Sequence, residues 1–151
     1  MKIIILIIIV VAAFSSLGLW LIASGNTTSE ETNMNYGISI MTDKMSYSVG
    51  ESIIMTFKVF NYTKADITFH FNTAQRYDFI IKDEEGNDIW RWSKDKMFAM
   101  VLGEEIIGPY NPEVIYTAEY NDRLSPGYYK VTGILVAQNR PMLGSIIIEV
   151  K

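Results

Sequence analysis

The chain has 151 residues, and its 17 acidic and 13 basic side chains give it a formal net charge of −4 at pH 7. This acidic balance excludes the basic face that nucleic-acid binding requires, so no nucleic-acid partner is expected. The absence of cysteine and the presence of a single histidine exclude disulfides, a Cys/His nucleophile pair and a multi-histidine metal site, and neither a metal nor a cofactor is predicted.

The N-terminal segment, residues 1–25, contains an uncharged apolar run over 3–23 behind the positive charge of Lys2. Its length is close to the roughly 20 apolar residues with which a helix crosses a bilayer. A cleaved signal peptide is the alternative, because residues 23–25 are small, as a signal peptidase requires. We therefore expect the segment to be a transmembrane anchor or a signal peptide. The protein would then be membrane-anchored through 3–23 with its C-terminal domain extracytoplasmic, or secreted if 1–25 are cleaved.

Residues 26–35 are rich in Ser, Thr, Asn and Glu, which predicts a flexible stalk. From residue 36 onward, apolar and polar residues alternate with a period of two, as in half-buried β-strands. The expected strands are 38–42, 52–61, 65–72, 76–83, 88–92, 98–102, 114–120, 128–137 and 145–150. Short strands separated by turn sequences predict an all-β sandwich over 36–151.

The register of these strands predicts the core, because residues two apart share one face of a strand. The side chains expected to be buried between two sheets are Phe57, Val59, Phe69, Phe71, Phe79, Ile81 and Trp90.

Two features resemble catalytic or metal-binding chemistry without matching it. His70 lies in the middle of an expected strand, which favours a solvent-facing or hydrogen-bonded histidine over a catalytic one. The acidic stretch 83–88 lacks the spaced ligands and the closing glutamate of a calcium loop. It is predicted to be a hairpin turn with Gly86 at positive φ. No catalytic residue is predicted, and the protein is not expected to be an enzyme.

The segment 75–98 is unusually rich in aromatic residues. Trp90 and Trp92 share one face of their strand, while Arg91 lies on the other. The two indoles are either part of the core or an aromatic platform for a sugar or a partner. Arg91 either stacks on a neighbouring aromatic ring or pairs with Asp78 across the hairpin.

This segment also carries a fingerprint. Its residues are Tyr77, Asp78, Phe79, Gly86, Trp90, Arg91, Trp92 and Ser93, followed by Phe98. The combination resembles the BsuPI-like intracellular proteinase inhibitor domain, and the resemblance covers about residues 38–150. It implies an immunoglobulin-like antiparallel β-sandwich and inhibition of a serine proteinase. The fingerprint residues themselves are expected to be structural, as parts of a well-packed hairpin.

Inhibition needs no catalytic residues, because a rigid, extended loop can fill a proteinase cleft. Two loops are candidates for this contact. The loop 138–143 offers Arg140, Pro141 and Met142, and the loop 103–112 offers Ile106 and Ile107. The alternative is that both loops merely connect strands in a non-inhibitory immunoglobulin-like module for adhesion or envelope assembly, whose partner is another surface protein.

Overall fold

The computed structural model describes residues 35–151. The expected anchor or signal peptide and nearly all of the expected stalk lie outside these residues. Within 35–151 there is no helix long and apolar enough to cross a membrane. The described part consists of ten strands: β1 (Tyr36–Thr42), β2 (Ser46–Tyr47), β3 (Ile53–Asn61), β4 (Ile67–Phe71), β5 (Tyr77–Lys82), β6 (Asp88–Arg91), β7 (Gly103–Ile107), β8 (Glu113–Tyr120), β9 (Gly127–Leu135) and β10 (Met142–Val150).

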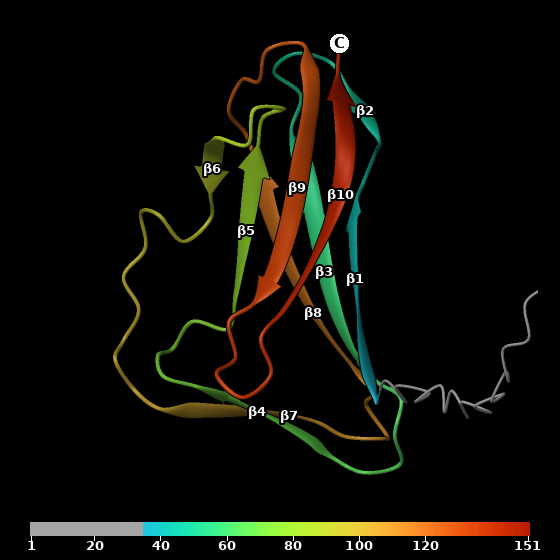
Figure 1. Cartoon of the computed structure of the whole chain (residues 1–151), viewed down its shortest axis with the longest axis vertical. Coiled ribbons are helices and arrows are strands. Elements are labelled where there is room, and N and C mark those ends of the chain that lie inside the picture. Colours follow the sequence, from blue (N-terminus) through green and yellow to red (C-terminus); the bar gives the residue numbers. More distant parts are fainter. Residues whose placement is uncertain (1–34) are drawn as a thin grey trace, which may run out of the picture. The chain divides into compact units, whose positions relative to one another are not determined.

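The strands form a sandwich of two main sheets (Figure 1). One sheet has the order β1-β3-β8, and the other has the order β2-β10-β9-β5-β6. Every pairing is antiparallel except that of β2, which runs parallel to the end of β10. In this order β3 lies next to β8, and β9 lies between β10 and β5, as the corresponding strands do in an immunoglobulin-like sandwich. The expected all-β class and immunoglobulin-like topology are therefore confirmed.

The core lies between the two sheets and follows the period-two pattern of the sequence. Six of the predicted core residues, all except Trp90, are buried. Trp90 is half-buried because it lies on the short edge strand β6, where its indole packs edge-on against Tyr120 with ring centroids 5.5 Å apart. Between the two sheets, Phe57 of β3 lies directly against Gly133 of β9. A Cβ atom at position 133 would lie 2.6 Å from the Phe57 ring, so only glycine fits there.

A third sheet, made of β4 and β7 alone, corrects two sequence expectations. The expected strand 98–102 is wrong, because these residues are in no strand. The expected loop 103–112 is wrong at its beginning, because Gly103–Ile107 pairs with β4. The expected loop 138–143 also ends early, since β10 begins at Met142. The short strand β2 was not expected.

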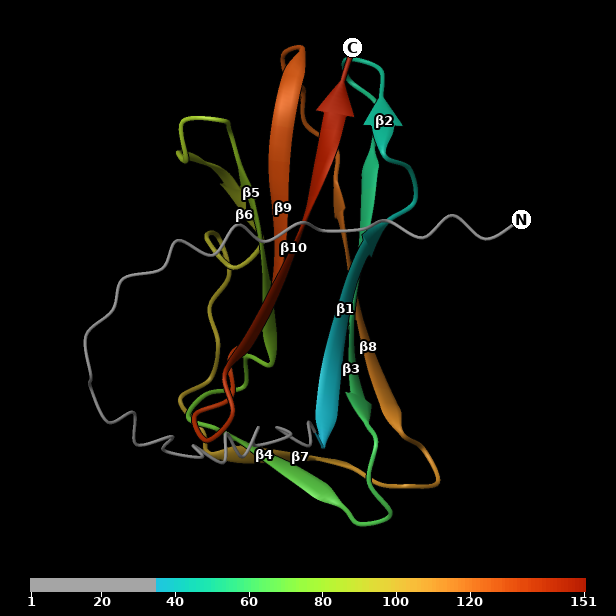
Figure 2. The same ribbon diagram turned by 45° about the vertical axis from the view of Figure 1, so that its right-hand side comes forward.

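This two-stranded ribbon closes one end of the sandwich, the lower end in both ribbon views (Figure 2). Its inward side chains Ile67, Phe69, Phe71 and Ile107 belong to the same core as the two main sheets. The free edge of β4 is covered by the turn between β9 and β10. There the Gln138 amide donates to the His70 carbonyl at 2.7 Å, and Asn139 Nδ2 donates to the Thr68 carbonyl at 2.9 Å. The edge is thus protected from pairing with another chain.

Candidate functional site

Three of the fingerprint residues, Phe79, Arg91 and Ser93, donate hydrogen bonds to Asp78, which is 3% exposed. We call this group the hairpin lock. Its Oδ1 accepts the backbone amides of Phe79 at 2.9 Å and of Ser93 at 3.1 Å. Its Oδ2 accepts the Ser93 hydroxyl at 2.7 Å and the Arg91 guanidinium at 3.1 Å. Of the two alternatives for Arg91, stacking on an aromatic ring or pairing with Asp78, the structure shows the pairing. One carboxylate holds β5, β6 and the first residues after β6 together.

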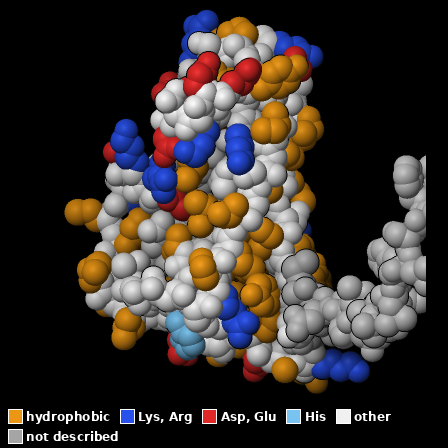
Figure 3. Space-filling view, viewed as in Figure 1, with side chains coloured by type: hydrophobic (Ala, Val, Ile, Leu, Met, Phe, Trp, Pro, Cys, Tyr) orange, Lys and Arg blue, Asp and Glu red, His pale blue; other side chains and the backbone are white. Residues whose placement is uncertain are grey.

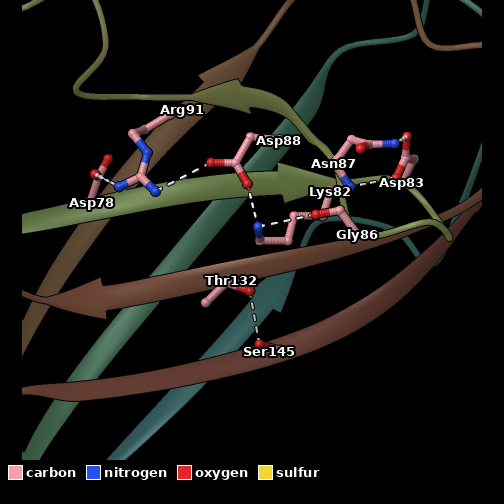
Figure 4. Close-up of polar contacts among 9 residues, drawn as sticks. All are labelled: Asp78, Lys82, Asp83, Gly86, Asn87, Asp88, Arg91, Thr132 and Ser145. Atoms are coloured by element: carbon pink, nitrogen blue, oxygen red, sulfur yellow. Dashed lines mark hydrogen bonds and ion pairs between the residues drawn. The ribbon is translucent and has the colours of Figure 1, made fainter.

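Beyond the hairpin lock, a series of ion pairs runs along the hairpin toward its turn (Figure 4). Arg91 also contacts Asp88 at 3.3 Å, and Asp88 pairs with Lys82 across the hairpin. The hydrogen bond from Lys82 holds the pKa of Asp88 below its ordinary value. At the turn, Asp83 accepts the Asn87 amide at 2.7 Å, and Gly86 has a φ of 87°. The prediction of a hairpin turn for 83–88 is confirmed.

A row of aromatic rings leads from the end of this hairpin into the core. Trp92 lies 4.3 Å from Tyr77, Tyr77 lies 4.6 Å from Tyr116, and Tyr116 lies 6.4 Å from Phe57, measured between ring centroids. At its outer end, Trp92 contacts Phe98 at 5.9 Å. The row therefore connects both sheets with the segment that follows β6. Trp90 and Trp92 pack against the core, and neither is fully exposed.

The predicted contact loops both lie at the end closed by β4 and β7, which we call the ribbon end. Arg140 and Pro141 are exposed at the β9–β10 turn, and the Arg140 guanidinium lies 5.4 Å from the centre of the Tyr36 ring. Met142 is half-buried in β10. Ile106 is 59% exposed on the outer face of β7.

Ile107 differs from the expectation that it lies in an exposed loop. It is 3% exposed because it occupies an inward position of β7, next to the core. Its side chain is therefore not available to a partner in this structure. Its carbonyl accepts a hydrogen bond from Asn61 Nδ2 at 2.6 Å, which ties β7 to the end of β3.

The segment 97–102, between β6 and β7, is a further exposed part of the ribbon end that the sequence pattern does not predict. Met97 is 100% exposed, and Met100 and Leu102 are each 84% exposed. Leu102 borders a hollow of about 520 Å³ beside His70 and Glu104. In the sequence these residues are a run of apolar side chains, and such a run predicts a strand rather than an exposed segment.

A buried polar group supports the start of β7 directly after this segment. Tyr116 donates a hydrogen bond to Glu105 at 2.6 Å, and the Arg76 Nε atom lies 3.9 Å from the same carboxylate oxygen. Burial, reinforced by the hydrogen bond to Glu105, raises the pKa of Tyr116. The Arg76 guanidinium also stacks on Phe71 and fills the space beside Gly103. The inward carboxylate of Glu105 is thus paired rather than isolated.

The remaining polar side chains of the ribbon end show no arrangement typical of catalysis or of a metal site. His70 is exposed on β4, and its Nδ1 lies 3.1 Å from Glu104 on β7. No group of three or more His, Asp or Glu residues within 35–151 could hold a metal ion. This end instead presents exposed apolar side chains beside the paired strands β4 and β7.

The sequence profile of the family described as BsuPI, intracellular proteinase inhibitor, matches residues 40–140. The chain belongs to this family. The match includes both halves of the BsuPI hairpin lock, the ribbon and the segment 97–102. It ends at Arg140, before Pro141 and Met142. A search of curated proteins found no significant match.

The BsuPI domain is also similar to several solved structures. These include Spo0M, a sporulation control protein from Bacillus subtilis, with a TM-score of 0.49 and 15% identity over 78% of this chain and 49% of that one. The C-terminal domain of Wzt gives 0.47 and 14% over 78% and 74%. A CARDB domain from Pyrococcus furiosus gives 0.45 and 11% over 77% and 87%. This chain thus spans about half of Spo0M, and these similarities carry no inference about function.

Proposed function

We propose that this protein inhibits a serine proteinase by binding it through surface loops, without catalytic residues of its own. Membership of the BsuPI family carries the proposal. The position of the exposed loops supports it, because Ile106, Arg140 and the segment 97–102 all belong to the ribbon end.

A rigid frame is what an inhibitor of this kind requires. Binding a proteinase orders the loop that enters the cleft, and a loop already held by its scaffold loses less conformational freedom. The ribbon end has such a scaffold, since Asn139 and Gln138 fix the β9–β10 turn to β4, and Arg76 with Tyr116 supports β7. The β-sandwich then acts as the support and the loops act as the contact.

Inhibition is tested with the purified full chain in mild detergent against a panel of serine proteinases. We expect saturable inhibition of at least one enzyme. Two variants, Arg140→Glu and Ile106→Ser, measure the share of the two loops that the sequence suggested, with thermal melting as the control for folding. If the parent chain inhibits no enzyme of the panel, the inhibitor proposal fails and the adhesion or envelope-assembly module takes its place.

The location of the domain is a separate proposal. We propose that residues 3–23 anchor the protein in a membrane with the domain on the extracytoplasmic side, or that cleavage of 1–25 releases it. The uncharged run behind Lys2 supports this. A membrane-impermeant lysine reagent applied to intact cells should label the domain. Complete protection until the cells are lysed would contradict the proposal and would place the domain in the cytoplasm.

A further inference from the structure

The segment 97–102 is unusual because it exposes large apolar side chains next to one another. Met97, Met100, Val101 and Leu102 are between 55% and 100% exposed. Hydrophobic side chains project from the side of the molecule on which this segment runs, the left side in the space-filling view (Figure 3). Scattered exposed apolar residues are ordinary, but a contiguous group marks an interaction site. The exposed apolar side chains of the segment would therefore match an apolar surface on a partner.

The backbone of this segment is available to a partner as well. Residues 97–102 belong to no strand or helix. Among the described residues, the only backbone hydrogen bond to this segment outside the sheets joins the Ala74 amide to the Ala99 carbonyl at 2.9 Å. The other amides and carbonyls are free to pair with a proteinase, which binds its substrates as extended chains.

The segment is nevertheless fixed at both ends and in the middle. Phe98 packs against Trp92, the outermost ring of the aromatic row. Ala99 is held by its hydrogen bond to Ala74. Gly103 lies against Arg76 so closely that a Cβ atom there would come within 2.5 Å of the guanidinium. A loop that is already held in this way loses less conformational entropy when it binds, which favours affinity.

Met100 directly follows the hydrogen-bonded Ala99 and lies three residues before Gly103. Met97 precedes Phe98, and Leu102 borders the hollow beside His70 and Glu104. Met100 lies between the Ala99 hydrogen bond and the Gly103 contact, and its unbranched side chain is 84% exposed. The S1 pocket of a serine proteinase selects one such side chain by size and charge. A long apolar side chain fits a deep apolar pocket, and it does not fit a pocket built for lysine or arginine.

We propose that Met97–Leu102 is the loop that enters the cleft of the inhibited proteinase, with Met100 in a large apolar S1 pocket. This inference rests on the inhibitor function proposed above. It places the main contact on a segment different from those of Arg140 and Ile106, which lie at the margin of the interface.

The test exchanges the specificity of the loop. The full chain and its Met100→Lys variant are assayed against subtilisin and chymotrypsin, whose pockets accept large apolar side chains, and against trypsin. The variant should inhibit the apolar-pocket enzyme at least about 30-fold more weakly, as for an interface hot spot, and should gain inhibition of trypsin. Met45→Lys is the matched control, because Met45 is 56% exposed near β2, away from the ribbon.

The outcomes separate this inference from the inhibitor function. If the parent inhibits an enzyme and Met100→Lys behaves like Met45→Lys, the loop assignment is wrong and the inhibitor function stands. If Arg140→Glu or Ile106→Ser abolishes inhibition while Met100→Lys does not, the contact lies on those segments and the assignment is equally wrong. If the parent inhibits none of the three enzymes or the wider panel, the function fails and the loop assignment falls with it. Equal melting temperatures show that each variant is folded.

Discussion

The two ends of the sandwich are closed by different chemistry. At the end opposite the ribbon, polar side chains accept hydrogen bonds from backbone amides in the turns. Tyr47 donates a hydrogen bond to Asp43 at 2.7 Å, Asp43 accepts the Ile54 amide at 2.9 Å, and Asp83 accepts the Asn87 amide. At the ribbon end, the segment 97–102 is fixed by aromatic packing and by one backbone hydrogen bond, and it exposes its apolar side chains.

This difference separates stability from recognition. Turns whose amides are already satisfied by nearby carboxylates need no partner, and they hold the strands that they join. A segment with free backbone groups and exposed methionines adds little buried area to the fold, and in the proposal above it is the part that binds. The BsuPI fingerprint belongs to the first kind, since Asp78 and Arg91 tie the β5–β6 hairpin together. The predictions below test whether the two roles can be changed independently.

The largest effect is expected for Phe79→Ala, which empties a fully buried site between the sheets. The free energy of unfolding should fall by about 3–5 kcal/mol, because the cavity loses both burial and contacts. Denaturant unfolding measures the change. A loss below about 1 kcal/mol would mean that the site collapses around the smaller side chain and that the core is not closely packed there.

Asp78→Ala should destabilise the hairpin by about 2–3 kcal/mol, since the amides of Phe79 and Ser93 lose their acceptor in a buried place. Asp88→Ala is the control. Asp88 is exposed and pairs with Lys82 and Arg91 on the surface, so its loss should matter much less. Equal effects of the two variants would show that the lock acts through surface charge rather than through buried hydrogen bonds.

The end opposite the ribbon should weaken in alkali. Burial, together with the hydrogen bond to Asp43, raises the pKa of Tyr47 to about 12. A raised pKa stabilises the fold fully below the unfolded value of 10.0, and this contribution is lost as the pH rises through about 12. Stability should therefore fall between pH 10 and 12, by on the order of 2 kcal/mol from this residue. Unfolding curves of the parent and of Tyr47→Phe measure it, and parallel pH profiles would exclude Tyr47 as the source.

The smallest effect on stability is expected at the ribbon end. Met100→Lys and Met97→Lys should each change the free energy of unfolding by less than about 0.5 kcal/mol, because both side chains already lie in solvent. Urea unfolding compares them with the parent. A loss above about 1 kcal/mol in either variant would show that the side chains of this segment support the fold and do not serve recognition alone.

Much of the sandwich is predictable from the sequence because its strands have one buried and one solvated face. Phe57 and Val59 in β3 and Phe79 and Ile81 in β5 show this period directly, and all four are buried. The pairing of Arg91 with Asp78 was one of two alternatives that the sequence left open, since opposite charges across a hairpin attract each other.

The ribbon end was less predictable, because its local sequence pattern predicts strands and loops at the wrong residues. Residues 98–102 are apolar enough for a strand, yet no edge pairs with them. Residues 103–107 contain two glutamates, and the inward one, Glu105, is tolerated only because Tyr116 and Arg76 reach it from elsewhere in the fold. Because these glutamates are typical of a solvated loop, the sequence predicts a loop at Ile107, which is in fact buried. Pairings between distant segments decide these residues, and local pattern does not reveal them.

The two most exposed of the described methionines, Met97 and Met100, make the ribbon end more sensitive to oxidants than the rest of the described domain. The chain has eight methionines and no cysteine, so its sulfur is all in thioethers. Oxidants convert an exposed thioether to a polar, chiral sulfoxide, while the fully buried Met55 is shielded. We expect peptide mass mapping after mild peroxide treatment to find Met97 and Met100 oxidised first. Such a domain would keep its fold and lose the apolar character of its most exposed segment until a sulfoxide reductase restored it.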